Sequence, residues 1–432
     1  MKTVPQEAAK DTLPEAKPEL LAPAGDMERL RLAVLYGADA VYLAGTTFGM
    51  RSFAGNFEDD GALEAAVRFA HAHHVRVHVT VNTMPRNEEV ARLPDYLAHL
   101  DAYGVDALIV ADVGVLALAK RYAPHAQKHI STQASIVNYQ AANAWHDLGA
   151  DRVILARELT LEEIAEIRAK TSPALQIETF VHGAMCVSYS GRCLLSNYMT
   201  GRDSNRGACA QPCRYEYTLM EEKRPGEYFP VFEDEKGTYI MNSRDLCMID
   251  HIPELMAAGV DSLKIEGRAK SAYYAAIVTG AYRHCIDAAA QGKPIDPVWR
   301  DEVEHVSHRH YSTGFFFGEP GQYTQSARYL REWQVCAVVL SCDETGLAVL
   351  SLRNKFRQGD EVEVVGPDLK PFSMVVPLMK DTEGAPLDEP RNPQMIFQMQ
   401  LPKPVQPIAW YGMRLHCRVS DEVFRFWQYT LQ

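Results

Sequence analysis

The sequence predicts a TIM-type (β/α)8 barrel with a cysteine-rich insert, followed by a small all-β domain. Three observations predict this: a helix-to-strand joint repeated four times, eight apolar runs of strand length, and a change to short alternating strands near residue 328. The chain has 432 residues, 47% of them hydrophobic. That is enough for a large barrel and an appended domain.

The repeated joint is the strongest of these observations. It occurs at residues 35–45, 102–112, 147–157 and 257–267, as "LYGADAVYLAG", "AYGVDALIVAD", "DLGADRVILAR" and "AAGVDSLKIEG". In each copy a glycine follows a helical segment and can take the left-handed conformation that ends a helix. An Asp and a nearly continuous apolar run follow, which is typical of a strand covered on both faces. The repeat indicates a parallel sheet built from strand–helix units.

Apolar runs between the joints complete a set of eight strands. We expect them at Leu20–Pro23, Ala40–Ala44, Val75–Val81, Ala107–Ala111, His129–Thr132, Arg152–Ala156, Gln176–Val181 and Ser262–Ile265. Helical segments such as 27–36 and 161–170 separate them. An open doubly wound sheet is the alternative, but no G-x-G-x-x-G or Walker A motif indicates a nucleotide site.

The domain boundaries follow from changes in composition and in the hydrophobic pattern along the chain. Residues 1–18 are polar and contain prolines, which predicts a disordered leader without a secretory h-region. The barrel is expected over 19–325 with an insert at 184–250, and a barrel-like all-β domain over 328–432. The chain contains no apolar run of the roughly 18 residues that span a bilayer. The cytoplasm is the expected location.

Polar side chains that follow the strands are the candidate site residues, because a TIM-type barrel carries its active site at the carboxyl ends of its strands. We expect His182, Glu266 and Arg268 to be catalytic. Arg51, Arg157 and Arg268 can clamp a carboxylate through paired N–H donors. The alternative for each of them is an ion pair at the barrel rim. The candidate substrate-binding residues are Arg51, Asn56, Arg157, Arg192, Arg206 and Arg214.

The insert begins directly after the seventh strand and is far longer than a βα loop requires. It holds five of the nine cysteines: Cys186, Cys193, Cys209, Cys213 and Cys247. Six, fifteen, three and thirty-three residues separate successive members of this set. Only the pair with three intervening residues resembles a zinc knuckle, whereas widely spaced thiolates can hold an Fe–S cluster. A thiol nucleophile, Cys186 with His182 as its base, and idle thiols remain open.

Charge is distributed unevenly along the chain. The net charge is −12, which argues against an indiscriminate nucleic-acid binder. Residues 184–214, however, hold four arginines and one acid, with Tyr189 and Tyr198 between them. This stretch is therefore locally basic within an acidic protein, although a solvated loop explains it equally well.

Several blocks of the sequence resemble one known family. They include "ELLAPAGDMERLRLAVLYGADAVYLAG", "FVHGAMCVSYSGRCLLSNY", "RGACAQPCRYEY", "SLKIEGRAKSAYY" and "YSTGFFFGEP". The chain resembles peptidase family U32, the collagenase-like peptidases, from about residue 19 to 325 and in its β-rich tail. Length and tail are most similar to the members that hydroxylate the tRNA wobble uridine.

The resemblance implies a [4Fe–4S] cluster, tRNA as partner at its anticodon region, and oxygen-independent formation of 5-hydroxyuridine with prephenate as co-substrate. By position it places three cluster ligands on Cys186, Cys193 and Cys209, and leaves Cys213 and Cys247 as alternatives for the fourth. A peptidase is the second hypothesis, on the family name. A binding scaffold with a structural cluster is the third.

Overall fold

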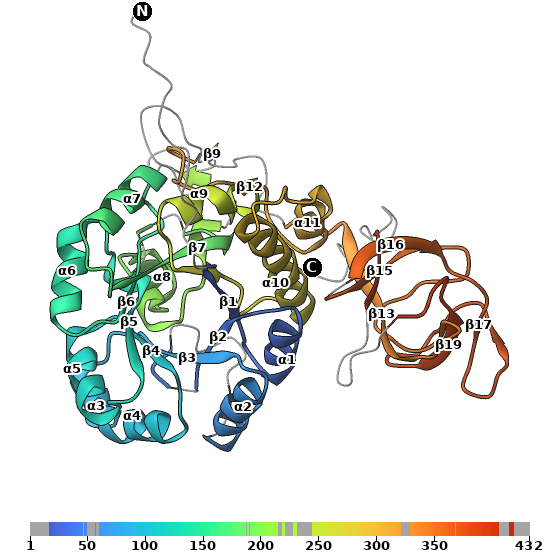
Figure 1. Cartoon of the computed structure of the whole chain (residues 1–432), viewed down its shortest axis with the longest axis horizontal. Helices are drawn as coiled ribbons and strands as arrows, with labels where there is room; N and C mark the ends of the chain where they lie inside the picture. The colour runs from blue at the N-terminus through green and yellow to red at the C-terminus, as the bar shows by residue number, and fades with distance from the viewer. Residues whose placement is uncertain are drawn as a thin grey trace, which may run out of the picture.

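The computed structural model describes residues 17–45, 47–49, 57, 60–186, 188–189, 191–214, 218–220, 228–230, 244–320, 329–367, 369–405 and 414–418. Within these ranges the chain forms a closed parallel barrel and a separate antiparallel β domain (Figure 1). Both parts of the predicted fold class are therefore confirmed. None of the described helices is long and apolar enough to cross a bilayer.

Eight parallel strands close the barrel. They are β1 (Glu19–Pro23), β2 (Ala40–Leu43), β3 (Arg76–Val81), β4 (Ala107–Val110), β5 (Gln127–Ile130), β6 (Arg152–Ile154), β7 (Gln176–Ala184) and β11 (Ser262–Ile265). They pair in chain order, and β11 closes the ring against both β1 and β7. All eight expected strands exist. The main differences are that β5 begins two residues earlier than expected and β7 runs three residues further.

Helices cover the outside of the barrel (Figure 1). They are α1 (Met27–Leu35), α2 (Asp60–Ala72), α3 (Asn87–Val90), α4 (Leu93–Ala102), α5 (Val113–Tyr122), α6 (Tyr139–Asp147), α7 (Leu161–Ala169), α9 (Ile252–Ala257), α10 (Ala272–Ala290) and α11 (Pro297–Glu302). The glycines of the four repeated joints all have positive φ, from 76° to 99°. The repeat therefore marks helix ends, as its sequence indicates.

The β domain is an eight-stranded antiparallel sheet. Its strands are β13 (Trp333–Cys342), β14 (Leu347–Leu352), β15 (Glu361–Gly366), β16 (Leu369–Val375), β17 (Met379–Lys380), β18 (Pro386–Leu387), β19 (Ile396–Gln400) and β20 (Arg414–Arg418). The sheet order runs from β16 to β18, and no pairing joins these two edges within the described residues. The domain has its own core, and Cys336 is fully buried in it.

The two domains are packed against each other. Val365 of β15 is buried in the core of the barrel domain. His284 of α10 hydrogen-bonds the Pro367 carbonyl at 2.8 Å, and Lys370 of β16 pairs with Asp296 at 2.7 Å. These contacts fix the β domain beside α10 and α11 (Figure 1).

The insert is tied at both ends to β7. That strand continues beyond the barrel ring, and β10 (Asp245–Cys247) pairs with its extension in antiparallel register, with Leu246 opposite Gly183. A short strand, β12 (Tyr311–Ser312), then pairs with β10. Gly183 has φ +109°, and a Cβ there would lie 2.4 Å from the Glu266 carbonyl oxygen. Only glycine lets β7 pass β11 this closely.

The barrel interior contains a charged network near the amino ends of its strands. Arg152 binds Glu19 at 2.5 Å and Glu178 at 2.9 Å, and Lys264 binds Glu178 at 2.8 Å. His78 lies in the same region and is fully buried; burial lowers its pKa to about 4. The ion pairs compensate charges that the apolar barrel wall could not solvate.

We expect the protein to lose stability as the pH falls from 7 to 5, in part through His78. The unfolded chain binds a proton there below its ordinary pKa of 6.5, whereas the folded chain stays neutral down to about 4. Stability present above pH 6.5 is therefore lost as the pH falls. The loss is about 2 kcal/mol at pH 5 and reaches about 3 kcal/mol only below pH 4, where the folded chain is protonated as well. Urea unfolding at pH 7 and pH 5 measures it.

The matched comparison is His78→Gln against His125→Gln, since the side chain of His125 is 86% exposed. The first variant should flatten the pH dependence and the second should not. An unchanged slope in His78→Gln would contradict the assignment.

Candidate functional site

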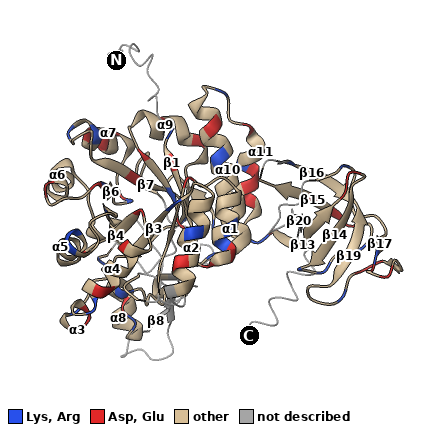
Figure 2. Ribbon diagram, turned by 60° about the horizontal axis from the view of Figure 1, so that its bottom comes forward, with Lys and Arg blue, Asp and Glu red and all other residues tan. Residues whose placement is uncertain are grey.

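A cavity of about 720 Å³ lies at the carboxyl end of the barrel, between the strand ends and the insert. In Figure 1 the insert helix α8 (Leu195–Thr200) projects onto the ring of strands, and in Figure 2 it lies at one end of the barrel. Four cysteines line this cavity: Cys186, Cys193, Cys209 and Cys213. The fold therefore gathers, around one space, thiols that are spread over 28 residues of sequence.

Short-range polar contacts shape the insert around Cys193. The Ser204 hydroxyl and the Asn205 amide both donate to the Cys193 carbonyl, at 2.6 and 3.0 Å. Gly191 lies against the barrel loop after β5, where a Cβ would be 2.4 Å from the Gln133 carbonyl oxygen. With φ +75° as well, this position requires glycine.

Arg206 fastens the insert to the barrel. Its guanidinium donates to both carboxylate oxygens of Glu89 in α3, at 2.7 and 2.9 Å. This bidentate pair lowers the pKa of Glu89, chiefly through the side-chain hydrogen bonds from Arg206. Arg206 is absent from the cavity lining. Arg206 therefore holds the insert to the barrel, and its role in substrate binding stays a prediction.

Cys247 is placed differently from the other four. It lies on β10 opposite His182, is buried, and does not line the cavity. Burial raises the pKa of its thiol to about 11. A thiolate, the form that binds metals, is therefore costly at this position.

Basic side chains surround the four thiols. Arg157, Arg202, Lys270 and Arg331 line the cavity, and Glu266 is the one carboxylate among its described lining residues. Arg157 donates to the Ala184 carbonyl at 3.0 Å, and Lys270 donates to the Ser307 carbonyl at 2.9 Å. The protein is acidic overall, yet this cavity is positive and suits anions.

His182 and Arg268 lie below the cavity rather than in its wall. His182 is surrounded by Tyr274, Tyr282 and Tyr311, with ring centroids 5.2 to 5.9 Å away. Burial lowers its pKa to about 3, so it is neutral at physiological pH and a weak base. Arg268 is buried and donates to the Thr80 hydroxyl at 3.0 Å.

The remaining candidate residues lie in different places. Glu266 lines the cavity, 3.4 Å from the Tyr42 hydroxyl. Arg192 lines a neighbouring hollow together with Tyr189 and Ser135. Arg51, Asn56 and the side chain of Arg214 lie outside the described residues.

Sequence reasoning missed several lining residues. Lys270 follows β11 by only five residues, so the rule of polar groups after strand ends could have found it. Tyr329 and Arg331 come from the connection between the two domains, and Lys270 lies 4.0 Å from the Tyr329 ring centroid. No local pattern marks a connecting segment as part of a barrel site.

We expect the four-thiol donor set to hold an Fe–S cluster rather than one zinc ion. A tetrahedral zinc site with Zn–S bonds of about 2.3 Å needs sulfurs about 3.8 Å apart. No three cysteines in the described part of the chain have sulfurs within 4.8 Å of one another. Four thiols around a wide, positive cavity suit a larger cluster, whose thiolate ligands carry negative charge.

Comparison with known proteins identifies the family. The sequence model described as peptidase family U32 matches residues 25–326, and that of the U32 C-terminal domain matches residues 331–409. The chain belongs to peptidase family U32. This confirms the resemblance seen in the sequence.

Several curated relatives are named for RNA hydroxylation, and one, of Methanocaldococcus jannaschii and 38% identical over 360 residues, is named an uncharacterized protease. The chain is 41% identical over 398 residues to tRNA hydroxylation protein P1 of Bacillus subtilis, covering 90% of this chain and 93% of that protein. It is 39% identical to tRNA hydroxylation protein P of Escherichia coli, covering 81% and 86%. It is also 40% identical to the 23S rRNA 5-hydroxycytidine C2501 synthase of E. coli, covering 62% of this chain and 39% of that protein.

Thiol reactivity tests the different placement of Cys247. In reduced, metal-free protein at pH 8, we expect iodoacetamide to label the exposed Cys186 at least about tenfold faster than Cys247. Burial and the raised pKa of Cys247 both suppress its thiolate. Peptide mass spectrometry measures the rates, and labelling in urea is the control in which both should react. Equal rates in the folded protein would contradict the placement.

Proposed function

We propose that this protein is an Fe–S-dependent enzyme that hydroxylates the wobble uridine of tRNA to 5-hydroxyuridine. One observation carries the proposal: four thiols and four basic side chains line one cavity at the carboxyl end of the barrel. The names of three relatives, which refer to tRNA and rRNA hydroxylation, support RNA as the substrate.

In this proposal the cluster ligands are Cys186, Cys193, Cys209 and Cys213. All four line the cavity, whereas Cys247 is buried beside it with a raised pKa. A bound [4Fe–4S] cluster would supply one-electron chemistry. The surrounding arginines and Lys270 would offset the negative charge of the thiolates and make their ionisation easier.

The same basic side chains provide a site for prephenate as co-substrate. Prephenate is a dicarboxylate, and Arg157, Lys270 and Arg331 reach the cavity from three different segments. Arg331 is held by a hydrogen bond to the Ser307 hydroxyl at 3.2 Å, and Lys270 is held by the Ser307 carbonyl. These fixed donors can orient a carboxylate before reaction, which lowers the entropic cost of binding.

Exposed aromatic and basic residues at the cavity mouth suit single-stranded RNA. Tyr189 is 53% exposed and lines the cavity, and Tyr198 in α8 is 89% exposed. An unpaired base can stack on such a ring, while Arg192 beside Tyr189 can bind a phosphate. An anticodon loop presents unpaired bases of this kind.

A peptidase gains less support from the geometry. The described cavity lining contains no histidine that could activate Cys186. His182, the candidate base, lies among tyrosines with its pKa lowered to about 3.

Complementation of a deletion strain tests the function. We expect tRNA from the strain grown without oxygen to lack nucleosides derived from 5-hydroxyuridine, and the wild-type gene to restore them. Cys209→Ser should fail to restore them. Arg331→Gln should reduce them at least about tenfold, because one of the donors proposed to bind the prephenate carboxylates is lost. Mass spectrometry of digested tRNA measures the levels.

Cys342→Ser is the matched control, since this thiol lies in the β domain and outside the cavity. It should restore modification fully. Full modification by Cys209→Ser would refute the role of the cluster, and full modification by Arg331→Gln would favour the scaffold hypothesis.

A further inference from the structure

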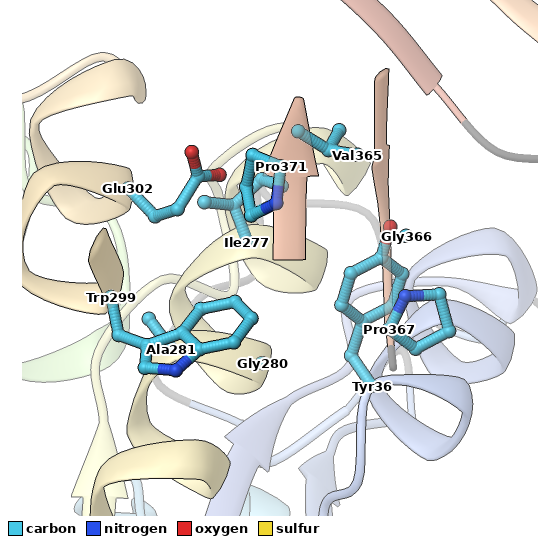
Figure 3. A pocket seen from close by; sticks show the side chains of 10 residues that line it. All are labelled: Tyr36, Ile277, Gly280, Ala281, Trp299, Glu302, Val365, Gly366, Pro367 and Pro371. Atoms are coloured by element: carbon cyan, nitrogen blue, oxygen red, sulfur yellow. The ribbon is translucent and has the colours of Figure 1, made fainter. Parts of the chain in front are cut away.

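A second group of potential metal ligands lies between the two domains, outside the cavity that the four cysteines line. The contact between α10, α11 and the β15–β16 hairpin encloses a small cavity of about 10 Å³, the size of one water molecule. In Figure 3, Glu302 extends from the end of α11 toward Val365 and Pro371 of the β domain. A carboxylate therefore enters an otherwise largely apolar interface.

Three side chains meet beside this cavity. His305 Nδ1 lies 3.2 Å from a carboxylate oxygen of Glu302 and 3.9 Å from one of Glu363 on β15. The three potential ligand atoms all lie within 4.8 Å of one another. The His305 ring packs on Trp333 of β13, at 4.2 Å between centroids, so the imidazole is oriented from the β-domain side.

Glu302 is the most buried carboxylate of this group. Its side chain is 4% exposed, and no lysine or arginine pairs with it among the described residues. Its hydrogen-bond partner is His305, which also faces the second carboxylate, Glu363. Two carboxylates this close repel each other, and a buried carboxylate requires a compensating charge.

We propose that Glu302, His305 and Glu363 form a binding site for a divalent transition-metal ion that clips the β domain to the barrel. Two carboxylate oxygens and one imidazole nitrogen are suitable ligands for manganese or zinc. Ligand atoms about 2.1 Å from a tetrahedral ion lie about 3.4 Å apart. The three ligand atoms here lie within 4.8 Å of one another, so small side-chain rotations would bring them to this spacing. Water completes the coordination from the partly exposed side, where Glu363 and His305 lie.

None of these three ligands lines the cysteine cavity. The ligands come from both domains: Glu302 and His305 from the barrel domain, and Glu363 from the β domain. Binding therefore stabilises the relative position of the domains, to which Tyr329 and Arg331 of the cavity are connected. The ion would hold in place the segment that supplies these two cavity residues.

Manganese binding to the full-length protein tests the proposal. Mn²⁺ is the probe because it prefers oxygen and nitrogen ligands, whereas zinc would also bind the cysteines. Electron paramagnetic resonance of free Mn²⁺ should show one bound ion per chain in the wild type. Glu302→Gln and Glu363→Gln should each abolish this site, and Mn²⁺ should raise the melting temperature of the wild type but not of these two variants.

Asp296→Asn is the matched control, because it weakens the other interdomain ion pair, with Lys370, without changing a proposed ligand. It should retain the bound ion. Glu363 is partly exposed, so its variant should fold even if Glu302→Gln does not. The proposal is wrong if the wild type binds no Mn²⁺ at millimolar concentration, or if Glu363→Gln binds it as the wild type does.

Discussion

The site depends on the extension of β7 beyond the barrel ring. Within the ring β7 pairs with β6 and β11, and its extension pairs with β10. Both ends of the cysteine-rich insert are therefore held at the carboxyl end of one strand. Gly183 permits the crossing, because any side chain there would collide with the Glu266 backbone. A loop as long as this one would pay a large entropic cost for closing on the barrel without such anchors.

Electrostatics then gives the anchored insert its chemical character. The chain is acidic, but the cavity under the insert gathers Arg157, Arg202, Lys270 and Arg331 around four thiols. Arg206, in contrast, forms an ion pair with Glu89, and this pair holds the insert to the barrel. These basic residues look equivalent in the sequence, but their positions in the structure differ. Four of them line the cavity, whereas Arg206 holds the insert that forms one side of it.

The fold was largely predictable from the sequence, because its signals are local. The four repeated joints predict helix ends and buried strands directly, at Gly37, Gly104, Gly149 and Gly259. The site was only partly predictable. Proximity to a strand end found Arg157 and Glu266, but it could not show that His182 is enclosed by three tyrosines. Nor could it reveal Tyr329 and Arg331, since their place depends on how the two domains pack.

The central claim is that the four thiols around the cavity, and not Cys247, hold the cluster. Iron and acid-labile sulfide per chain, measured after anaerobic purification of Cys213→Ser and Cys247→Ser, test it most directly. The account predicts that Cys213→Ser loses the cluster while Cys247→Ser retains about four irons and four sulfides, as expected for a [4Fe–4S] cluster. Retention by Cys213→Ser with loss in Cys247→Ser would contradict it.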